Sequence, residues 1–101
     1  MIRHREADVI RSFKDKLTRS IADGTVRKGF PADLVRRAQQ LLTLLDAASS
    51  MEDLRSPPGN RLEKLLGDRE GQHSIRINKQ WRICFRWTEA GPEEVEITDY
   101  H

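Results

Sequence analysis

Three side chains suited to chemistry on a nucleotide stand together at the end of the 101-residue sequence, as Asp99-Tyr100-His101. Histidine is the side chain that best exchanges protons near neutral pH, and a carboxylate can share that work. A tyrosine can stack on a base or donate a hydrogen bond to a phosphate oxygen. This tail could carry acid–base chemistry if it folds against a polar surface, and it is a frayed terminus if it does not.

Two arginines, Arg76 and Arg82, are expected on the polar face of neighbouring antiparallel strands. Directly opposed residues on one face of such strands lie roughly 5 Å apart. The two guanidinium groups could therefore grip one phosphate through forked hydrogen bonds. The alternative is that both arginines only solvate the exposed side of a half-buried sheet, and charge alone favours this alternative.

The sequence offers no metal site and none of the common catalytic motifs. Its histidines, at positions 4, 73 and 101, form no His-x-x-x-His or carboxylate–histidine cluster, and the single cysteine, Cys84, excludes a cysteine-based zinc site. A glycine-rich phosphate loop and a G-x-S-x-G motif are also absent. His73 falls on a predicted apolar face, where we expect a hydrogen-bonded core histidine. We therefore expect a protein that works without metal or cofactor.

Composition predicts a single domain over residues 1–101. Hydrophobic residues make up 37% and charged residues 34% of the chain, which fits one core under a charged surface. The apolar stretches are too short to cross a bilayer, and the first residues lack the apolar segment of a secretory signal. A lone cysteine cannot form an intramolecular disulfide. We expect a cytoplasmic protein with no membrane partner.

The charges are polarised along the chain although the formal net charge is only +2. Positions 69–86 hold five cations against one acid, whereas positions 87–99 hold five acids and no lysine or arginine. A basic surface beside an acidic one is expected, and this distribution says more about a nucleic-acid partner than the net charge does.

Two helices are expected to position the strands. Leu17 and Ile21 are four residues apart in a short helix over 14–22, and a preceding segment, 8–13, could be a short strand. The clearest helix begins near Pro31 and repeats apolar residues at helical spacing. That leucine stripe, which must pack against another element, comprises Leu34, Ala38, Leu41, Leu42 and Leu45.

From position 73 the apolar residues alternate, which predicts three strands of an antiparallel meander. The first and third strands have apolar residues at alternate positions, Ile75 and Ile77 in the first and Val95 and Ile97 in the third. Turns are expected near 78–80 and 89–92. The middle strand alternates Trp81, Ile83, Phe85 and Trp87 with Arg82, Cys84 and Arg86. Packing the apolar face on the leucine helix gives an α+β domain of two layers.

Five stretches of the chain carry a family resemblance: SPPGNRLE (56–63), LLGDREGQ (65–72), SIRIN (74–78), QWRICF (80–85) and VEITDYH (95–101). Together they resemble the HigB (plasmid-maintenance killer) branch of the RelE superfamily. The resemblance runs from Val9 onward, and its motifs are specific in combination rather than singly. Similar proteins commonly begin at a motif like MIRSF, and VIRSF (9–13) takes its place here, so residues 1–8 are expected to be an extension.

The resemblance implies a RelE-like, microbial-ribonuclease-type fold, with short helices packed on a small, mainly antiparallel sheet. It implies the toxin of a type II toxin–antitoxin system, an endoribonuclease that cuts mRNA in the ribosomal A site without a metal. The partners that it implies are the ribosome and a HigA-type helix-turn-helix antitoxin, which makes any contacts to operator DNA.

Residue roles follow from the resemblance only where positions match. Arg82 matches the arginine on the scissile phosphate, and Asp99, Tyr100 and His101 match a C-terminal catalytic group. Glu63 stands where some members have histidine and could act as a base. The basic positions expected to line the RNA site are Arg61, Lys64, Arg69 and Arg76.

Two departures keep a second function open. Glu63 replaces a histidine and Leu66 replaces a lysine of some members, so an attenuated or non-catalytic module that binds the ribosome or an antitoxin is the alternative. A DNA-binding regulator is disfavoured, because no helix-turn-helix pattern is visible and the basic residues cluster on strands.

Overall fold

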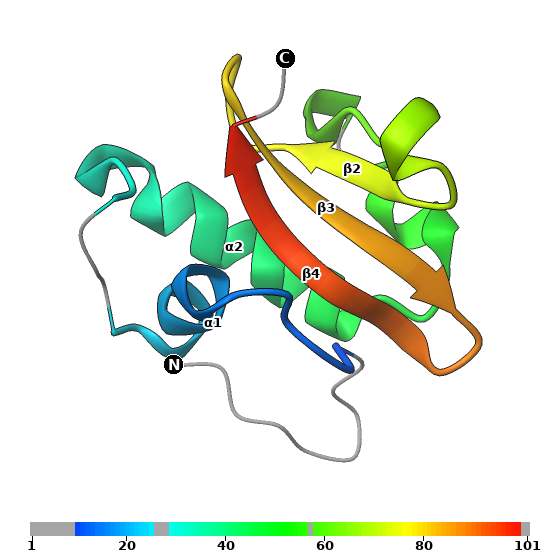
Figure 1. Ribbon diagram of the computed structural model, residues 1–101, viewed down its shortest axis with the longest axis horizontal. Helices are drawn as coiled ribbons and strands as arrows, with labels where there is room; N and C mark the ends of the chain where they lie inside the picture. Colours follow the sequence, from blue (N-terminus) through cyan, green and yellow to red (C-terminus); the bar gives the residue numbers. More distant parts are fainter. Residues whose placement is uncertain (1–9, 26–28, 57, 100–101) are drawn as a thin grey trace.

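The strands of the sheet follow one another in space as they do in the sequence. The computed structural model describes residues 10–25, 29–56 and 58–99. Its sheet has the order β1-β2-β3-β4 and is antiparallel throughout, from strands Glu63–Lys64, His73–Arg76, Trp81–Thr88 and Gly91–Asp99. Helix α2 (Val35–Ala47) crosses behind one face, and α1 (Lys16–Asp23) lies beside β4 (Figure 1). The α+β expectation is confirmed.

Local signals explain where the helices begin and end. The Asp15 carboxylate accepts a hydrogen bond from the Thr18 amide at 2.8 Å, which caps the start of α1. Gly24 ends that helix in a left-handed conformation, with φ of 84°. Helix α2 follows a 3-10 turn, η1 (Ala32–Leu34), and further single turns follow it at η2 (Met51–Leu54), η3 (Pro58–Asn60) and η4 (Gly67–Arg69). None of the described helices has the length and apolar character needed to cross a membrane.

One apolar core joins the helices to one face of the sheet. The leucine stripe of α2 packs with fully buried residues of the three long strands, as the alternation predicted. Trp81 and Trp87 are partly buried against this core, and Trp81 meets Phe30 edge to face at 5.1 Å between ring centroids. The buried strand residues are Ile75, Ile83, Phe85, Val95 and Ile97.

The edges of the sheet differ from the expectation. In the described part of the predicted 8–13 strand, residues 10–13, only Phe13 pairs, in an isolated parallel bridge with Val95. The Arg11 amide still donates to the Pro92 carbonyl at 2.8 Å, so this segment covers the β4 edge without forming a regular strand. At the other edge, the two-residue β1 was not predicted, because a strand of two residues is too short for any periodicity. Residues 1–8, the expected extension, lie outside the described residues.

Strand β4 begins earlier than expected and contains a bulge. Gly91 and Pro92, expected in a turn, pair with β3, and Pro92 is tolerated because β4 is the last strand of the sheet. The pairing register shifts by one residue between Cys84 and Arg86, where Glu94 has φ of 51°. This bulge turns Val95 into the core and leaves Glu94 exposed.

Candidate functional site

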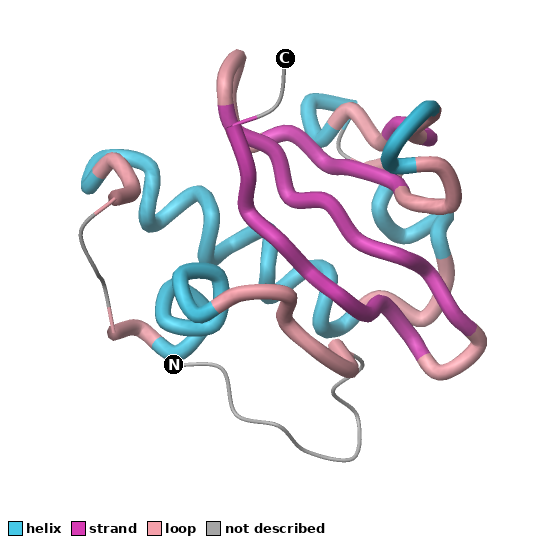
Figure 2. Tube along the Cα trace, in the orientation of Figure 1, coloured by secondary structure: helices cyan, strands magenta, loops and turns pink. Residues whose placement is uncertain are grey.

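Helix α2 lies behind one face of the sheet (Figure 2). The strand register places the polar residues of the meander on the opposite face. Register places Arg76 directly opposite Arg82, and Arg82 opposite Thr98. Ser74, Cys84 and Glu96 form the next row of the same face, two residues along each strand. The predicted opposition of the two arginines is confirmed.

Arg82 is the most completely held cation of this face. Its Nε donates to the Ser74 hydroxyl at 2.8 Å, and its Nη2 donates to the Arg61 carbonyl at 3.0 Å. The same Nη2 forms an ion pair with Glu63. Only 13% of the Arg82 side chain is exposed. Three segments of the chain therefore fix one guanidinium, which is the condition for a preorganised phosphate ligand.

Arg61 contributes its backbone rather than the predicted cationic side chain. Its φ is 46°, a left-handed conformation that costs about 1 kcal/mol or more for a residue with a side chain. Its carbonyl accepts from Arg82, while its own side chain is exposed. The strained residue thus lies at the site, between the η3 turn and β1.

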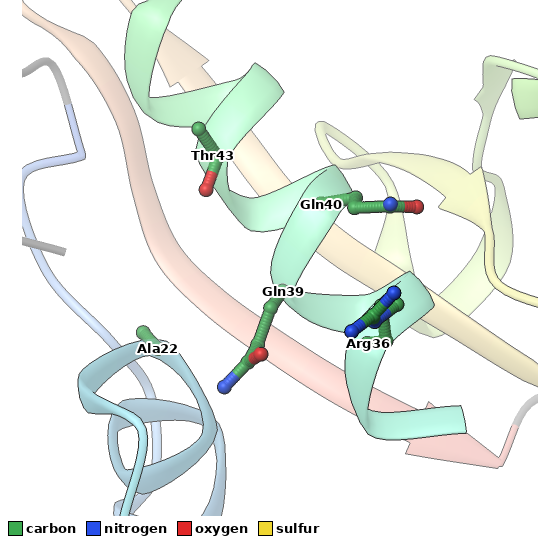
Figure 3. Close-up of a pocket in the computed structure, with 5 residues that line it drawn as sticks. All are labelled: Ala22, Arg36, Gln39, Gln40 and Thr43. Atoms are coloured by element: carbon green, nitrogen blue, oxygen red, sulfur yellow. The ribbon is translucent and has the colours of Figure 1, made fainter. Parts of the chain in front are cut away.

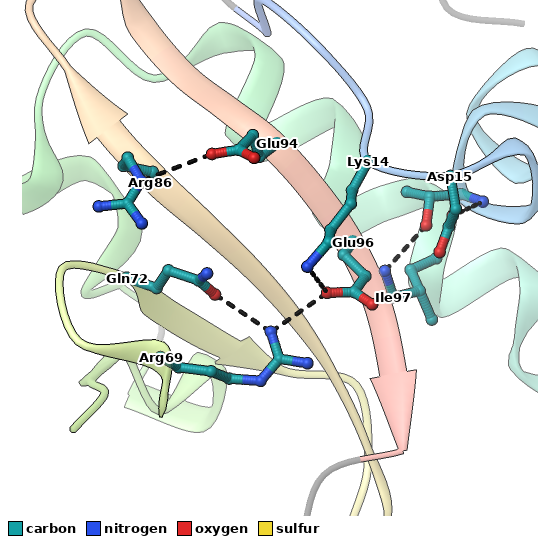
Figure 4. Close-up of polar contacts among 9 residues, drawn as sticks. Lys14, Asp15, Arg69, Gln72, Arg86, Glu94, Glu96 and Ile97 are labelled. Carbon is teal, nitrogen blue, oxygen red and sulfur yellow. Dashed lines mark hydrogen bonds and ion pairs between the residues drawn. The ribbon is translucent and has the colours of Figure 1, made fainter. Parts of the chain in front are cut away.

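A second network surrounds Glu96, in the next row of the same face (Figure 4). Arg69 Nη1 donates to both Glu96 and Gln72 at 3.1 Å, and Lys14 Nζ approaches the same Glu96 oxygen at 3.7 Å. The network ties the η4 loop and the segment before α1 to β4. Arg69, a predicted RNA contact, is thus already bound by protein acceptors.

Cys84 lies in the same row of this face as Glu96. The thiol is fully buried, and burial raises its pKa. A thiol held in the protonated form is a poor nucleophile, so the site does not contain a reactive cysteine.

The structure separates two predicted site residues from the arginines. Lys64 pairs with His73 on the other face of the sheet, because it alternates with Glu63 in β1. Asp99 pairs with Trp81, also off the arginine face, and its carboxylate accepts from Gln80 at 2.9 Å. Tyr100 and His101 lie outside the described residues, so their predicted roles stay predictions.

Comparison with known proteins places this site in a family. The profile described as "RelE-like toxin of type II toxin-antitoxin system HigB" matches residues 11–101. The chain belongs to the HigB-like toxin family. The matched region includes the Arg82 site and the C-terminal Asp99-Tyr100-His101, so the residues on which the resemblance rested lie inside it.

Relatives of this HigB-like toxin agree with that membership. It is 42% identical to "Toxin HigB-1" of Vibrio cholerae serotype O1 over 79 residues, which cover 77% of the chain and 83% of the relative. It is 33% identical to "Endoribonuclease HigB" of Proteus vulgaris over 93 residues, 92% of the chain and 100% of the relative. An uncharacterized protein of Haemophilus influenzae is 34% identical over 72% of each chain.

Sequence reasoning missed three parts of the site in this HigB-like toxin. The contact of Ser74 with Arg82 was not predicted, because it is diagonal across the strands. The Arg61 carbonyl carries no signal in a side-chain pattern. The Glu96 network joins Lys14 to Arg69, which are far apart in sequence.

A hollow on the helical side of the HigB-like toxin is a poorer candidate (Figure 3). It has a volume of about 380 Å³ and lies where Ala22 of α1 faces Arg36, Gln39, Gln40 and Thr43 of α2. None of these side chains exchanges protons near neutral pH, so the hollow cannot supply acid–base chemistry. Among the described residues, no group of three or more His, Cys, Asp and Glu could hold a metal ion.

His73 differs from the expected hydrogen-bonded core histidine. Its Nδ1 is buried with no partner among the described residues, and its ring stacks on Phe85 at 6.3 Å between centroids. Burial lowers the pKa of His73, and the positive charges of Lys64 and Arg55 lower it further. Both effects favour the neutral form of this imidazole in the folded protein.

The lowered pKa of His73 predicts acid sensitivity. The unfolded chain binds the proton more tightly, so the contribution of His73 to stability is complete above about pH 6.5 and is lost as pH falls through the lower folded pKa. The free energy of unfolding, measured with urea, should be lower at pH 5.5 than at pH 7.5. This difference should be smaller in His73→Phe, because phenylalanine keeps the stacked ring and does not titrate. An equal loss in both proteins would contradict this prediction.

Proposed function

We propose that this HigB-like toxin is an endoribonuclease that cuts mRNA in the ribosomal A site and so inhibits translation. The observation that carries the proposal is the guanidinium of Arg82, fixed on an open sheet face by Ser74 and Arg61 with Arg76 opposite it. The name of the Proteus vulgaris relative, an endoribonuclease matched over its whole length, supports the same activity.

The proposed reaction uses the nucleophile that RNA carries itself. The 2′-oxygen loses its proton and bonds to the adjacent phosphorus, the bond from phosphorus to the 5′-oxygen breaks, and the leaving oxygen gains a proton. The products are a 2′,3′-cyclic phosphate and a 5′-hydroxyl, and the chemistry needs no metal. Arg82, assisted by Arg76, neutralises charge on the non-bridging oxygens.

The proton transfers are assigned to the C-terminal group and to Glu63. Asp99 and His101 would serve as base and acid, Tyr100 would orient the nucleotide, and Glu63 is a second candidate for the base. Asp99 ends β4 on the opposite face, next to the residues that complete this group, so the assignment requires the tail to turn toward the arginines. Arg61, Lys64 and Arg69 would add long-range attraction for RNA.

The proposed partners follow from the family. A type II toxin is made with an antitoxin, and we propose a HigA-type helix-turn-helix protein, through which alone the pair would contact operator DNA. The proposed setting is the cytoplasm, where ribosomes translate. The alternative function is a non-catalytic module that binds the ribosome or the antitoxin, which the ion pair of Glu63 with Arg82 favours because it occupies the phosphate ligand.

The purified chain should be added to ribosomes translating a defined message, and the new RNA ends mapped. We expect cuts within the translated region that carry 2′,3′-cyclic phosphate and 5′-hydroxyl ends and that vanish when the nucleotide at the cut has no 2′-hydroxyl. Translation arrest without cuts would support the binding module instead. Ends with 3′-hydroxyl and 5′-phosphate would refute the proposed mechanism.

A further inference from the structure

The three groups that accept hydrogen bonds or ion pairs from Arg82 differ in how easily they can move away from its guanidinium. Ser74 is fully buried, and the Arg61 acceptor is a backbone carbonyl held between η3 and β1. The Glu63 side chain is 55% exposed, on a strand of only two residues. An exposed carboxylate can turn into solvent at little cost, because water replaces its partner. Glu63 is therefore the acceptor that can leave Arg82.

A carboxylate and a phosphate compete for the same guanidinium. Both present paired oxygens that match the planar fork of an arginine, with charge-assisted hydrogen bonds. Glu63 places Oε1 on Nη2 of the Arg82 side chain, of which only 13% is exposed. An RNA phosphate that binds this nitrogen must take the place of the carboxylate.

We propose that Glu63 is a built-in competitor of phosphate, which occupies Arg82 in the RNA-free protein and is displaced when the scissile phosphate binds. This inference rests on the proposed function in that Arg82 binds a phosphate of RNA. Ser74 and Arg61 keep the guanidinium oriented before and after the exchange. The ligand that displaces Glu63 is a phosphodiester of single-stranded RNA.

The other three ion pairs among the described residues of this face do not have this asymmetry. Glu96 is only 18% exposed and is held by both Lys14 and Arg69, so it is fixed. Arg86 and Glu94 are 41% and 51% exposed, at 3.5 Å, so neither partner is held in place by burial. Arg82 alone combines a buried guanidinium with an exposed carboxylate. The pair of Arg86 with Glu94 is thus a matched control for the loss of one negative charge.

The test measures binding of a short single-stranded RNA with 2′-O-methyl groups, which cannot be cut, by fluorescence anisotropy at low salt. Glu63→Gln keeps the size of the side chain and removes its charge. We expect it to tighten the Kd by about threefold to tenfold, whereas Glu94→Gln changes it less than twofold. In the background of Arg82→Lys, a cation that lacks the fork, Glu63→Gln should tighten binding much less.

Three other outcomes would overturn the proposal. Equal tightening by Glu63→Gln and Glu94→Gln would show a general effect of charge, and unchanged or weaker binding by Glu63→Gln would show that Glu63 does not compete. Absence of binding by every form would remove Arg82 as a phosphate ligand. Thermal unfolding of each variant checks the fold. If Glu63→Gln tightens RNA binding as expected but the wild-type protein never cuts RNA, the proposed function is refuted and this inference stands.

Discussion

Replacing Arg82 with alanine should slow RNA cutting by about 100-fold to 1,000-fold, the usual cost of removing one donor that stabilises transition-state charge. Ser74 and the Arg61 carbonyl hold the arginine, so its guanidinium needs no reorganisation when charge develops on the phosphate. The readout is the single-turnover rate on translating ribosomes at saturating toxin. A rate within threefold of the wild type would remove Arg82 from the reaction.

Two variants separate this catalytic effect from damage to the fold. Arg82→Ala leaves the buried Ser74 hydroxyl without its partner, which costs roughly 1–3 kcal/mol of stability, so unfolding must be measured in parallel. Arg82→Lys keeps the charge but cannot satisfy three acceptors with a fork, and we expect most of the rate to be lost as well. Arg86→Ala, an arginine further along the same strand and half exposed, should keep most of the activity.

The opposition of Arg76 and Arg82 could be predicted from sequence because it needs only two facts. Alternating apolar residues fix which side chains share a face, and a short turn fixes the register of a hairpin. The ion pair of Glu63 with Arg82 could not be predicted, because β1 has two residues and joins β2 through a loop. The side-chain directions in β1 depend on the buried Leu65, which follows this strand, and on the Leu65 amide, which donates to the Gln72 carbonyl.

The same limit explains why the sequence did not reveal that Lys64 and the arginines lie on different faces of the sheet. A resemblance assigns basic positions to a site one by one, and it does not say which face of a strand each occupies. In β1, Glu63 faces Arg82 and Lys64 faces His73, so adjacent residues serve opposite sides of the sheet. The lysine instead raises the local positive charge around His73 and helps to lower the pKa of that imidazole.

The core was predictable because its pattern is long and redundant. The five apolar residues of the helical stripe predict that the helix packs against another element. The alternation along β3 independently predicts an apolar face of the sheet for it to pack on. The contact of the N-terminal segment with β4 was not predictable, because it consists mainly of backbone hydrogen bonds and a single bridge at Phe13. The bulge at Glu94 was equally invisible, as it depends on the pairing of β4 with β3.

Replacing Phe85 with alanine should cost about 3–5 kcal/mol of unfolding free energy, a large share of the roughly 5–15 kcal/mol that a domain of this size has. Phe85 is fully buried on β3, stacks on His73 and lies opposite the bulge of β4, where the neighbouring backbone cannot easily collapse into a cavity. Urea unfolding followed by tryptophan fluorescence measures the loss.

Phe85 also links the core to the chemistry, because it lies between Cys84 and Arg86 on the strand that carries Arg82. A cavity beneath β3 frees the strand to shift, so cutting by Phe85→Ala should fall together with stability. Phe85→Leu, which keeps most of the apolar volume, should lose less than half as much stability and retain activity. A fully active, equally stable Phe85→Ala protein would show that the packing of β3 on α2 does not position the arginine site.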